Sequence, residues 1–135
     1  MSEARLLVAR AHASIGVVNY KVDLQAGRHP LTADEPPAHG GADAGPAPFE
    51  LLLSALAACT AITLRMFAER KGWDLKGVDV DVRMSREGDQ AHIDRTLSLH
   101  GELAVEQKAR LLEIAEKTPV TLAVKNGVAI TTTLR

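Results

Sequence analysis

The first third of the chain alternates apolar and polar residues in the way that strands do. In the segment 18–24 the apolar phase is held by Val18, Tyr20, Val22 and Leu24. This alternation predicts a half-buried strand, and residues 5–11 are expected to pair with it. A third short strand is expected over 31–34, after the turn signal Ala26-Gly27-Arg28. The three segments together predict an antiparallel meander.

A long apolar helix is expected in the middle of the chain, after a proline- and glycine-rich loop over 35–48. Pro48 suits a first helical turn, Glu50 places negative charge near the positive end of the helix dipole, and Gly72 supplies a stop. The helix is therefore expected over about 48–71. Apolar side chains surround its first half, so a second copy of the chain is expected to cover it in an obligate homodimer.

The next segments predict a β-hairpin. Val78, Val80, Val82 and Met84 alternate with polar residues, and the loop Glu87-Gly88-Asp89 leads to a partner strand over 92–100. Arg95 falls in the apolar phase of that second strand, where leucine or valine would be usual. A position at a strand end, or a side chain that reaches to solvent, would explain it.

The remaining residues predict two helices and a final strand. Apolar residues at helical spacing run over 104–117. Thr118 and Pro119 then fit the N-cap and first position of a short helix over 119–125. Residues 128–134, rich in threonine and branched side chains, are expected to form a last strand. The whole order predicts a single α+β domain over 1–135 with a largely antiparallel sheet.

Charge and composition exclude several classes of function. With 16 basic and 17 acidic side chains, the formal net charge of -1 gives no positive field for phosphates, so nucleic acid is not an expected partner. The apolar run Leu51–Leu64 is interrupted by polar residues and followed by Arg65, so no membrane span is expected. No secretory signal is recognisable, and the single cysteine excludes an internal disulfide, which favours the cytoplasm.

Cys59 is the candidate for chemistry, because no histidine cluster, paired-cysteine spacing or phosphate loop indicates a metal or a cofactor. Its neighbours on a helix face would be Leu52, Ala55, Leu56, Ile62, Thr63 and Met66. This mostly apolar face leaves inert packing as the alternative. A reactive thiolate here needs a cation or hydrogen-bond donors from elsewhere in the fold.

The segment Gly45-Pro46-Ala47-Pro48-Phe49-Glu50, continuing through Ala57-Ala58-Cys59-Thr60, resembles the OsmC/Ohr family of osmotically induced and organic-hydroperoxide-resistance proteins. The likeness extends over Ala68–Trp73 and Thr118-Pro119-Val120. It implies an OsmC-like α+β fold and an intertwined homodimer, in which two long cysteine-bearing helices pack together in the centre. It also implies a peroxidase that uses a helix cysteine, a second resolving cysteine, an arginine and a glutamate.

Carried onto this sequence, the resemblance makes Cys59 the peroxidatic residue. Thr118 stands at the resolving position and cannot form a disulfide, so an external thiol is the expected reductant. The alternative for Thr118 is a plain helix cap. The family glutamate directly follows Pro48, where this chain has Phe49, and Glu50 comes one residue later.

Glu50 and an arginine complete the expected site. On a regular helix Glu50 lies opposite Cys59, and its alternative role is to favour the helix start. The family arginine belongs to the turn between the first two strands, here Ser14-Ile15-Gly16. Arg28, Arg10 and Arg95 are the substitutes that the sequence offers, and Arg28 is our choice.

We therefore expect a cytoplasmic homodimer that reduces small organic hydroperoxides through Cys59, with an external thiol reductant and no cofactor. The alternative is a non-enzymatic stress or binding protein on the same dimeric scaffold. In that case a small apolar ligand or a partner would occupy a pocket between subunits, and Cys59 would only fill space.

Overall fold

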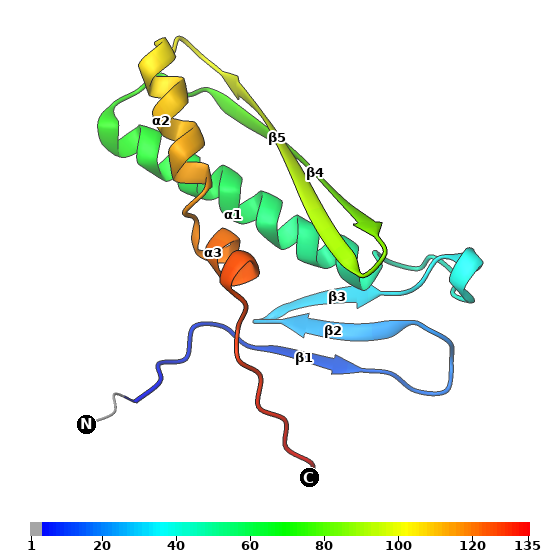
Figure 1. Cartoon of the computed structure of the whole chain (residues 1–135). Helices are drawn as coiled ribbons and strands as arrows, with labels where there is room; N and C mark the ends of the chain where they lie inside the picture. Colours follow the sequence, from blue (N-terminus) through cyan, green and yellow to red (C-terminus); the bar gives the residue numbers. More distant parts are fainter. Residues whose placement is uncertain (1–3) are drawn as a thin grey trace. The chain divides into compact units, whose positions relative to one another are not determined.

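The computed structural model describes residues 4–135, which form two compact units (Figure 1). The first unit contains the chain up to Leu51, and the second contains Leu52–Arg135. The described residues form antiparallel strands and three α-helices, so the α+β class is confirmed. That all 135 residues act as one domain stays a prediction.

The first unit is built on a three-stranded antiparallel sheet of order β1-β2-β3. Its strands are β1 (Ala11–Ser14), β2 (Val22–Ala26) and β3 (His29–Ala33). The predicted meander is confirmed, with Leu24 opposite Leu31 on adjacent strands.

The limits predicted for the first two strands were wrong. The expected strand over 5–11 shares only Ala11 with β1, and residues 18–21 precede β2 without joining the ladder. The backbone N–H of Tyr20 donates instead to Asp34 Oδ1, 3.3 Å away, so this segment is held by a side chain and not by a neighbouring strand. Alternation marked the half-buried positions Val22 and Leu24 correctly, but Val18 and Tyr20 are exposed, and the pattern could not indicate which residues find a ladder partner.

The loop after β3 is organised by the carboxylate of Asp34. Asp34 is buried, and besides Tyr20 it accepts hydrogen bonds from the backbone N–H groups of Glu35, Ala42 and Ala44 at 2.7, 3.2 and 3.0 Å. These donors, with Ala44 the largest contributor, lower the pKa of Asp34 against the opposing effect of burial. The loop includes a short 3-10 helix, η1 (Pro37–His39), and closes tightly, because a Cβ at Gly41 would lie 1.9 Å from the Glu35 carbonyl oxygen.

Helix α1 (Pro48–Lys71) has the predicted bounds, and its start follows from local chemistry. Pro48 occupies the first position, and the Ala47 carbonyl accepts the N–H of Leu51 at 3.1 Å. The N–H of Ala47 in turn donates to Glu50 Oε1 at 2.9 Å, the reciprocal half of a capping box. The expected role of Glu50 at the helix start is thus present.

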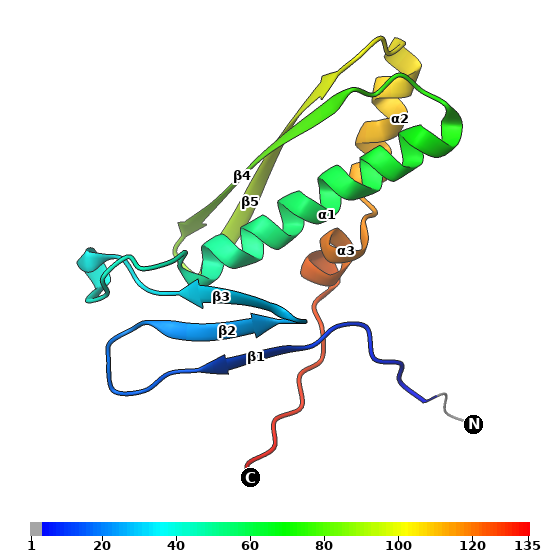
Figure 2. The ribbon, with the colours of Figure 1, turned by 180° about the vertical axis from the view of Figure 1, so that it is seen from behind.

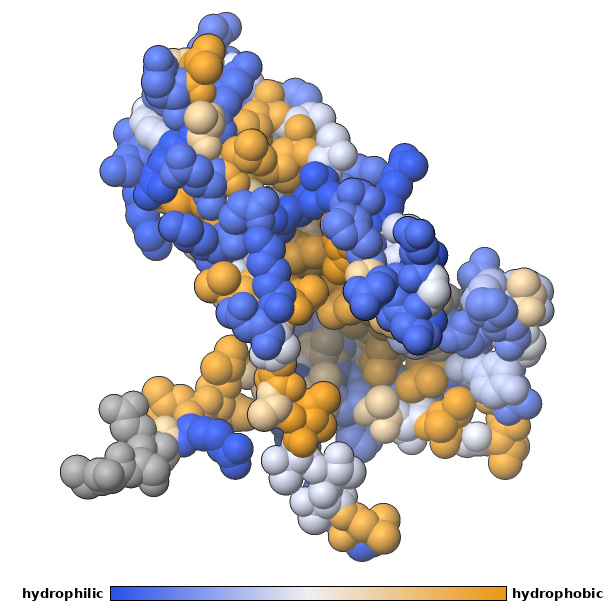
Figure 3. Space-filling view, viewed as in Figure 1, coloured by the Kyte–Doolittle hydropathy of each residue, from blue (hydrophilic) through white to orange (hydrophobic). Residues whose placement is uncertain are grey.

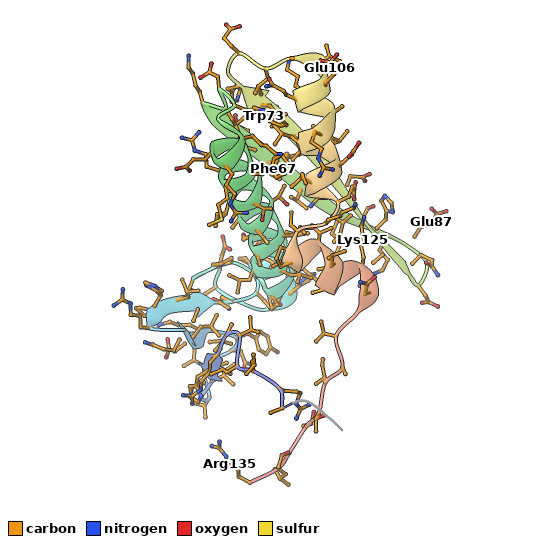
Figure 4. The ribbon with its side chains drawn as sticks, turned by 90° about the vertical axis from the view of Figure 1, so that its left-hand side faces the viewer. Phe67, Trp73, Glu87, Glu106, Lys125 and Arg135 are labelled. Carbon is orange, nitrogen blue, oxygen red and sulfur yellow. The ribbon has the colours of Figure 1, made fainter. Side chains whose placement is uncertain are left out.

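The second unit places the remaining elements on one side of α1 (Figures 1 and 2). The hairpin strands β4 (Gly77–Glu87) and β5 (Gln90–His100) pair antiparallel, as predicted. Helices α2 (Val105–Ala115) and α3 (Pro119–Asn126) follow, close to the predicted ranges. Figure 4 shows α2, α3 and the hairpin on the same side of α1.

The core of the second unit lies where α1, α2 and the hairpin meet. Its buried members are Leu64, Ala68, Leu75, Leu111 and Ala115. Phe67 and Trp73 close one end of α1 as an edge-to-face pair with ring centroids 5.6 Å apart (Figure 4). Only one stripe of α1 is buried, and Ile62 and Met66 on the other side remain 54% exposed. An apolar face of this long helix is therefore uncovered within its own unit.

The last predicted strand is absent from the described structure. Residues 128–135 are extended and exposed, with Ile130 and Leu134 open to solvent. The threonines and branched residues give this tail strand propensity, but a strand also needs a neighbour for its backbone hydrogen bonds.

The expectation that no segment crosses a membrane stays a prediction. The apolar run Leu51–Leu64 is part of α1, which has 24 residues and, among the described residues, is the helix long and apolar enough to cross a membrane. Core helices of soluble proteins meet the same criterion, so it is weak evidence for a span.

Candidate functional site

Cys59 lies in the middle of α1 and is half-buried. Its Sγ is 4.0 Å from Thr63 Oγ1, one turn further along the helix. Within Leu52–Arg135, no guanidinium or ammonium group makes a hydrogen bond to this sulfur. The thiol is therefore neither sealed in the core nor held by a cation of its own unit.

Arg95 is the buried cation of this unit, and its surroundings correct the sequence interpretation. It lies in the middle of β5 with its side chain only 12% exposed, and so neither ends a strand nor reaches to solvent. Its Nη1 donates to Thr60 Oγ1 and to Thr121 Oγ1, both at 2.9 Å. Two threonine hydroxyl groups thus take the place of the apolar contacts that this strand position would normally make.

Arg95 joins the hairpin to all three helices. Its Nη2 donates to the carbonyl oxygen of Ala115 at 2.9 Å, at the end of α2, while Thr60 belongs to α1 and Thr121 to α3. A buried guanidinium is costly unless its N–H groups find acceptors, and these bonds supply acceptors for three of them. Arg95 therefore fixes the packing around Thr60, the residue next to Cys59.

Thr118, at the expected resolving position, is fully buried and caps α3. Its Oγ1 accepts the N–H of Thr121 at 3.3 Å and lies 2.6 Å from Thr121 Oγ1. The cap predicted from the sequence is confirmed. Thr60 and Thr121 were missed, and the signal that pointed toward them was the arginine in the apolar phase of β5.

An acidic and a basic side chain border the Arg95 cluster. Glu116 Oε2 is 2.5 Å from Lys125 Nζ and 3.7 Å from Arg95 Nη2. The Lys125 hydrogen bond is the main cause that lowers the pKa of Glu116, with added attraction from Lys125 and Arg95 against a desolvation cost. Figure 4 shows Lys125 on α3, toward the hairpin.

A hollow of about 360 Å³ opens beside this cluster. Its apolar lining includes Leu56, Ile93, Leu97, Leu112 and Val124, and its polar lining includes Arg95, Glu116, Thr121 and Lys125. In Figure 3 recessed apolar atoms are bordered by hydrophilic side chains in this part of the unit. Cys59 is not among the residues that line it.

The other two residues expected at the site belong to the first unit. Arg28 is exposed in the turn between β2 and β3, and Glu50 lies in the first turn of α1. Cys59 belongs to the second unit. Residues 4–135 contain no group of three or more histidine, cysteine, aspartate or glutamate side chains able to hold a metal ion.

A long helix bearing a half-buried cysteine, packed on an antiparallel hairpin and followed by two short helices, defines an OsmC-type α+β fold. The family model for OsmC-like protein matches residues 40–133, and the chain belongs to this family. No curated protein matches the chain in sequence.

Solved structures share this fold at low sequence identity. An OsmC-like protein from Mycoplasma pneumoniae matches with a TM-score of 0.73 and 18% identity, over 90% of this chain and 89% of its own. An organic hydroperoxide resistance protein OsmC from Legionella pneumophila matches with a TM-score of 0.66 and 21% identity, over 90% of this chain and 92% of its own. An organic hydroperoxide resistance protein from Elizabethkingia anophelis gives 0.67 and 18%, over 93% of each chain.

Proposed function

We propose that this protein reduces organic hydroperoxides through Cys59, with an external thiol as reductant. The observation that carries the proposal is the position of Cys59. Cys59 lies on the helix that resembles the cysteine helix of the family, the residue is half-buried, and its sulfur lies 4.0 Å from the hydroxyl oxygen of Thr63. Names of structural relatives from Legionella pneumophila and Elizabethkingia anophelis, which refer to organic hydroperoxide resistance, support the same substrate class.

The reaction balances with one protein cysteine. The Cys59 thiolate attacks one oxygen of the hydroperoxide, the O–O bond breaks, and after proton transfer the products are a Cys59 sulfenic acid and an alcohol. An external thiol then condenses with the sulfenic acid, which releases water and leaves a mixed disulfide. A second thiol reduces that disulfide and restores Cys59.

The external reductant follows from the state of Thr118. This hydroxyl is buried and committed to the cap of α3 and to Thr121, and it has no sulfur with which to form a disulfide. In the proposed cycle the oxidised Cys59 meets a thiol from solution, and the half-burial of this residue in its own unit is consistent with that approach.

The groups that activate the thiolate are proposed to come from outside the Cys59 unit. Arg95 donates to Thr60, Thr121 and the Ala115 carbonyl and makes no hydrogen bond to Cys59, so it is a poor candidate. Arg28 remains our choice for the cation and Glu50 for the acidic partner. The uncovered apolar face of α1 supports a homodimer, in which a second copy covers Ile62 and Met66 and contributes to the site. We place this dimer in the cytoplasm, where thiols stay reduced.

The test compares the parent protein with Cys59→Ser and, as a matched control, Thr63→Ser, in cumene hydroperoxide consumption with dithiothreitol as the electron donor. The proposal predicts turnover by the parent and by Thr63→Ser, and none above the protein-free rate by Cys59→Ser. Equal consumption by Cys59→Ser and the parent would refute it.

A second candidate is a non-enzymatic dimer that binds a small apolar ligand. It is favoured by the absence, within Leu52–Arg135, of a cation bonded to Cys59, and by the apolar hollow that Cys59 does not line. A parent protein that consumes no hydroperoxide with any thiol donor would support this candidate.

A further inference from the structure

The hollow beside α3 has walls suited to an alkyl chain. Five aliphatic side chains from the three α-helices and β5 line it: Leu56, Ile93, Leu97, Leu112 and Val124. Its volume of about 360 Å³ lies in the range of small-molecule pockets, roughly 300 to 1,000 Å³. Leu112 is 58% exposed and Val124 38% exposed, so the apolar wall continues to the mouth of the hollow.

The charged groups of this hollow do not cancel. Arg95 and Lys125 are cationic and both lie near the single carboxylate of Glu116, at 3.7 and 2.5 Å. Because Glu116 is also held ionised, the three groups together carry one net positive charge. The remaining titratable lining residue, His92, pairs at 3.3 Å with Asp94, which does not line the hollow.

From this geometry we propose that the hollow binds an amphipathic monoanion, with an alkyl body against the aliphatic wall and a carboxylate near Lys125 and Arg95. The occupant matches both properties of the site, since apolar walls favour the chain and the uncompensated charge favours one anionic head. Arg95 is already fixed by Thr60 and Thr121, so its charge is oriented before the ligand arrives. The site is separate from Cys59 and does not depend on its chemistry.

The test titrates ¹⁵N-labelled protein with octanoate, 1-octanol and octyltrimethylammonium, each below its micelle concentration, and follows amide shifts by NMR. The proposal predicts saturable shifts centred on β5, the end of α2 and α3, with octanoate the tightest ligand and the ammonium the weakest. Binding of octyltrimethylammonium as tight as octanoate, or no saturable shift with octanoate, would overturn it.

Two variants localise the site. Lys125→Gln is expected to weaken octanoate about tenfold and to leave 1-octanol unchanged, because one charge-assisted contact is lost. The control Lys108→Gln, at an exposed position of α2 that does not line the hollow, should leave the affinities for octanoate and 1-octanol unchanged. Val124→Trp should fill the hollow and abolish binding of both ligands, with far-ultraviolet circular dichroism confirming that it folds.

Other occupants give different results. If a second copy of the chain covers the hollow, octanoate produces no local shifts and Val124→Trp lowers the mass measured by light scattering. If Val124→Trp keeps the octanoate affinity of the parent, the ligand binds elsewhere. Either result would contradict the proposal, and should Val124→Trp fail to fold, the ligand ranking and the Lys125→Gln comparison decide alone.

Discussion

Cys59 and Thr60 are adjacent on α1, yet their surroundings are opposite. Thr60 is fully buried, donates to the Leu56 carbonyl at 2.7 Å and accepts from Arg95. Cys59 is half-buried, and its sulfur has one polar neighbour at 4.0 Å. A rotation of about 100° per residue is enough to place one on the packed stripe and the other beside it.

The contrast indicates a division of labour along the helix. The stripe that carries Thr60 holds the hairpin and the helices together, whereas the sulfur of Cys59 makes no strong contact that stabilises the fold. Changes at Cys59 should therefore alter chemistry with little effect on stability, and changes in the Arg95 cluster should do the reverse.

The largest expected effect is on activity, in Cys59→Ser. Removing the attacking sulfur should lower hydroperoxide turnover by about a thousandfold or more. The free energy of unfolding should change by less than about 1 kcal/mol, since no strong contact is lost. Denaturant unfolding and peroxide assays on the same preparations check both. A Cys59→Ser protein as active as the parent, or one that is severely destabilised, breaks the comparison.

The largest expected effect on stability is in Arg95→Met. This change leaves buried oxygens of Thr60, Thr121 and Ala115 without their donor and should cost about 3 kcal/mol. Arg83→Met, an exposed arginine of the same hairpin paired with Asp81, is the control and should cost less than about 0.5 kcal/mol. Urea unfolding measures the difference, and equal costs for the two arginines would remove the structural role of Arg95.

Thr118→Val should destabilise by about 1 to 2 kcal/mol. It keeps the buried volume but removes the hydroxyl that accepts the N–H of Thr121 at the start of α3. Thr118→Ser retains the cap and should remain close to the parent. The peroxide reaction should persist in Thr118→Val, because the proposed cycle takes its reducing thiol from solution. Loss of turnover with normal folding would instead assign Thr118 a chemical role.

The contribution of the buried Asp34 carboxylate to stability should depend on pH. Its pKa is lower in the folded state than its ordinary 3.8, so its stabilising effect is present above that value and is lost as pH falls through the lower, folded pKa. Asp34→Asn should lower Tm at neutral pH by less than Arg95→Met does, because one acceptor oxygen remains. The difference in Tm between the parent protein and Asp34→Asn should be smaller in strong acid. Thermal unfolding at pH 7 and pH 2 measures this difference. A constant difference would contradict the assignment.

The sequence predicted α1 and the hairpin well, because their limits are set locally. Proline and glycine punctuate α1, and alternation over Val78–Met84 marks a strand whose partner follows at once. The segments 5–11 and 128–134 have strand-forming residues, but residues 5–10 and 128–134 have no ladder partner in the described structure. Strand propensity alone therefore could not predict whether these two segments form strands.

The residues of the candidate site also differ in whether the sequence could predict them. Cys59 and the cap at Thr118 could be found from motif and spacing. The partners of Arg95 could not, since Thr60 and Thr121 are 35 and 26 residues away from it in sequence. A charge in an apolar phase signals that polar partners exist, but only packing identifies them.

The reactivity of the Cys59 sulfur is tested most directly by dimedone trapping. The protein is treated with an equimolar amount of cumene hydroperoxide in the presence of dimedone, and the peptide that contains Cys59 is analysed by mass spectrometry. We expect a dimedone adduct on Cys59 that forms as the peroxide disappears. Unmodified Cys59 in the presence of persisting peroxide would contradict it.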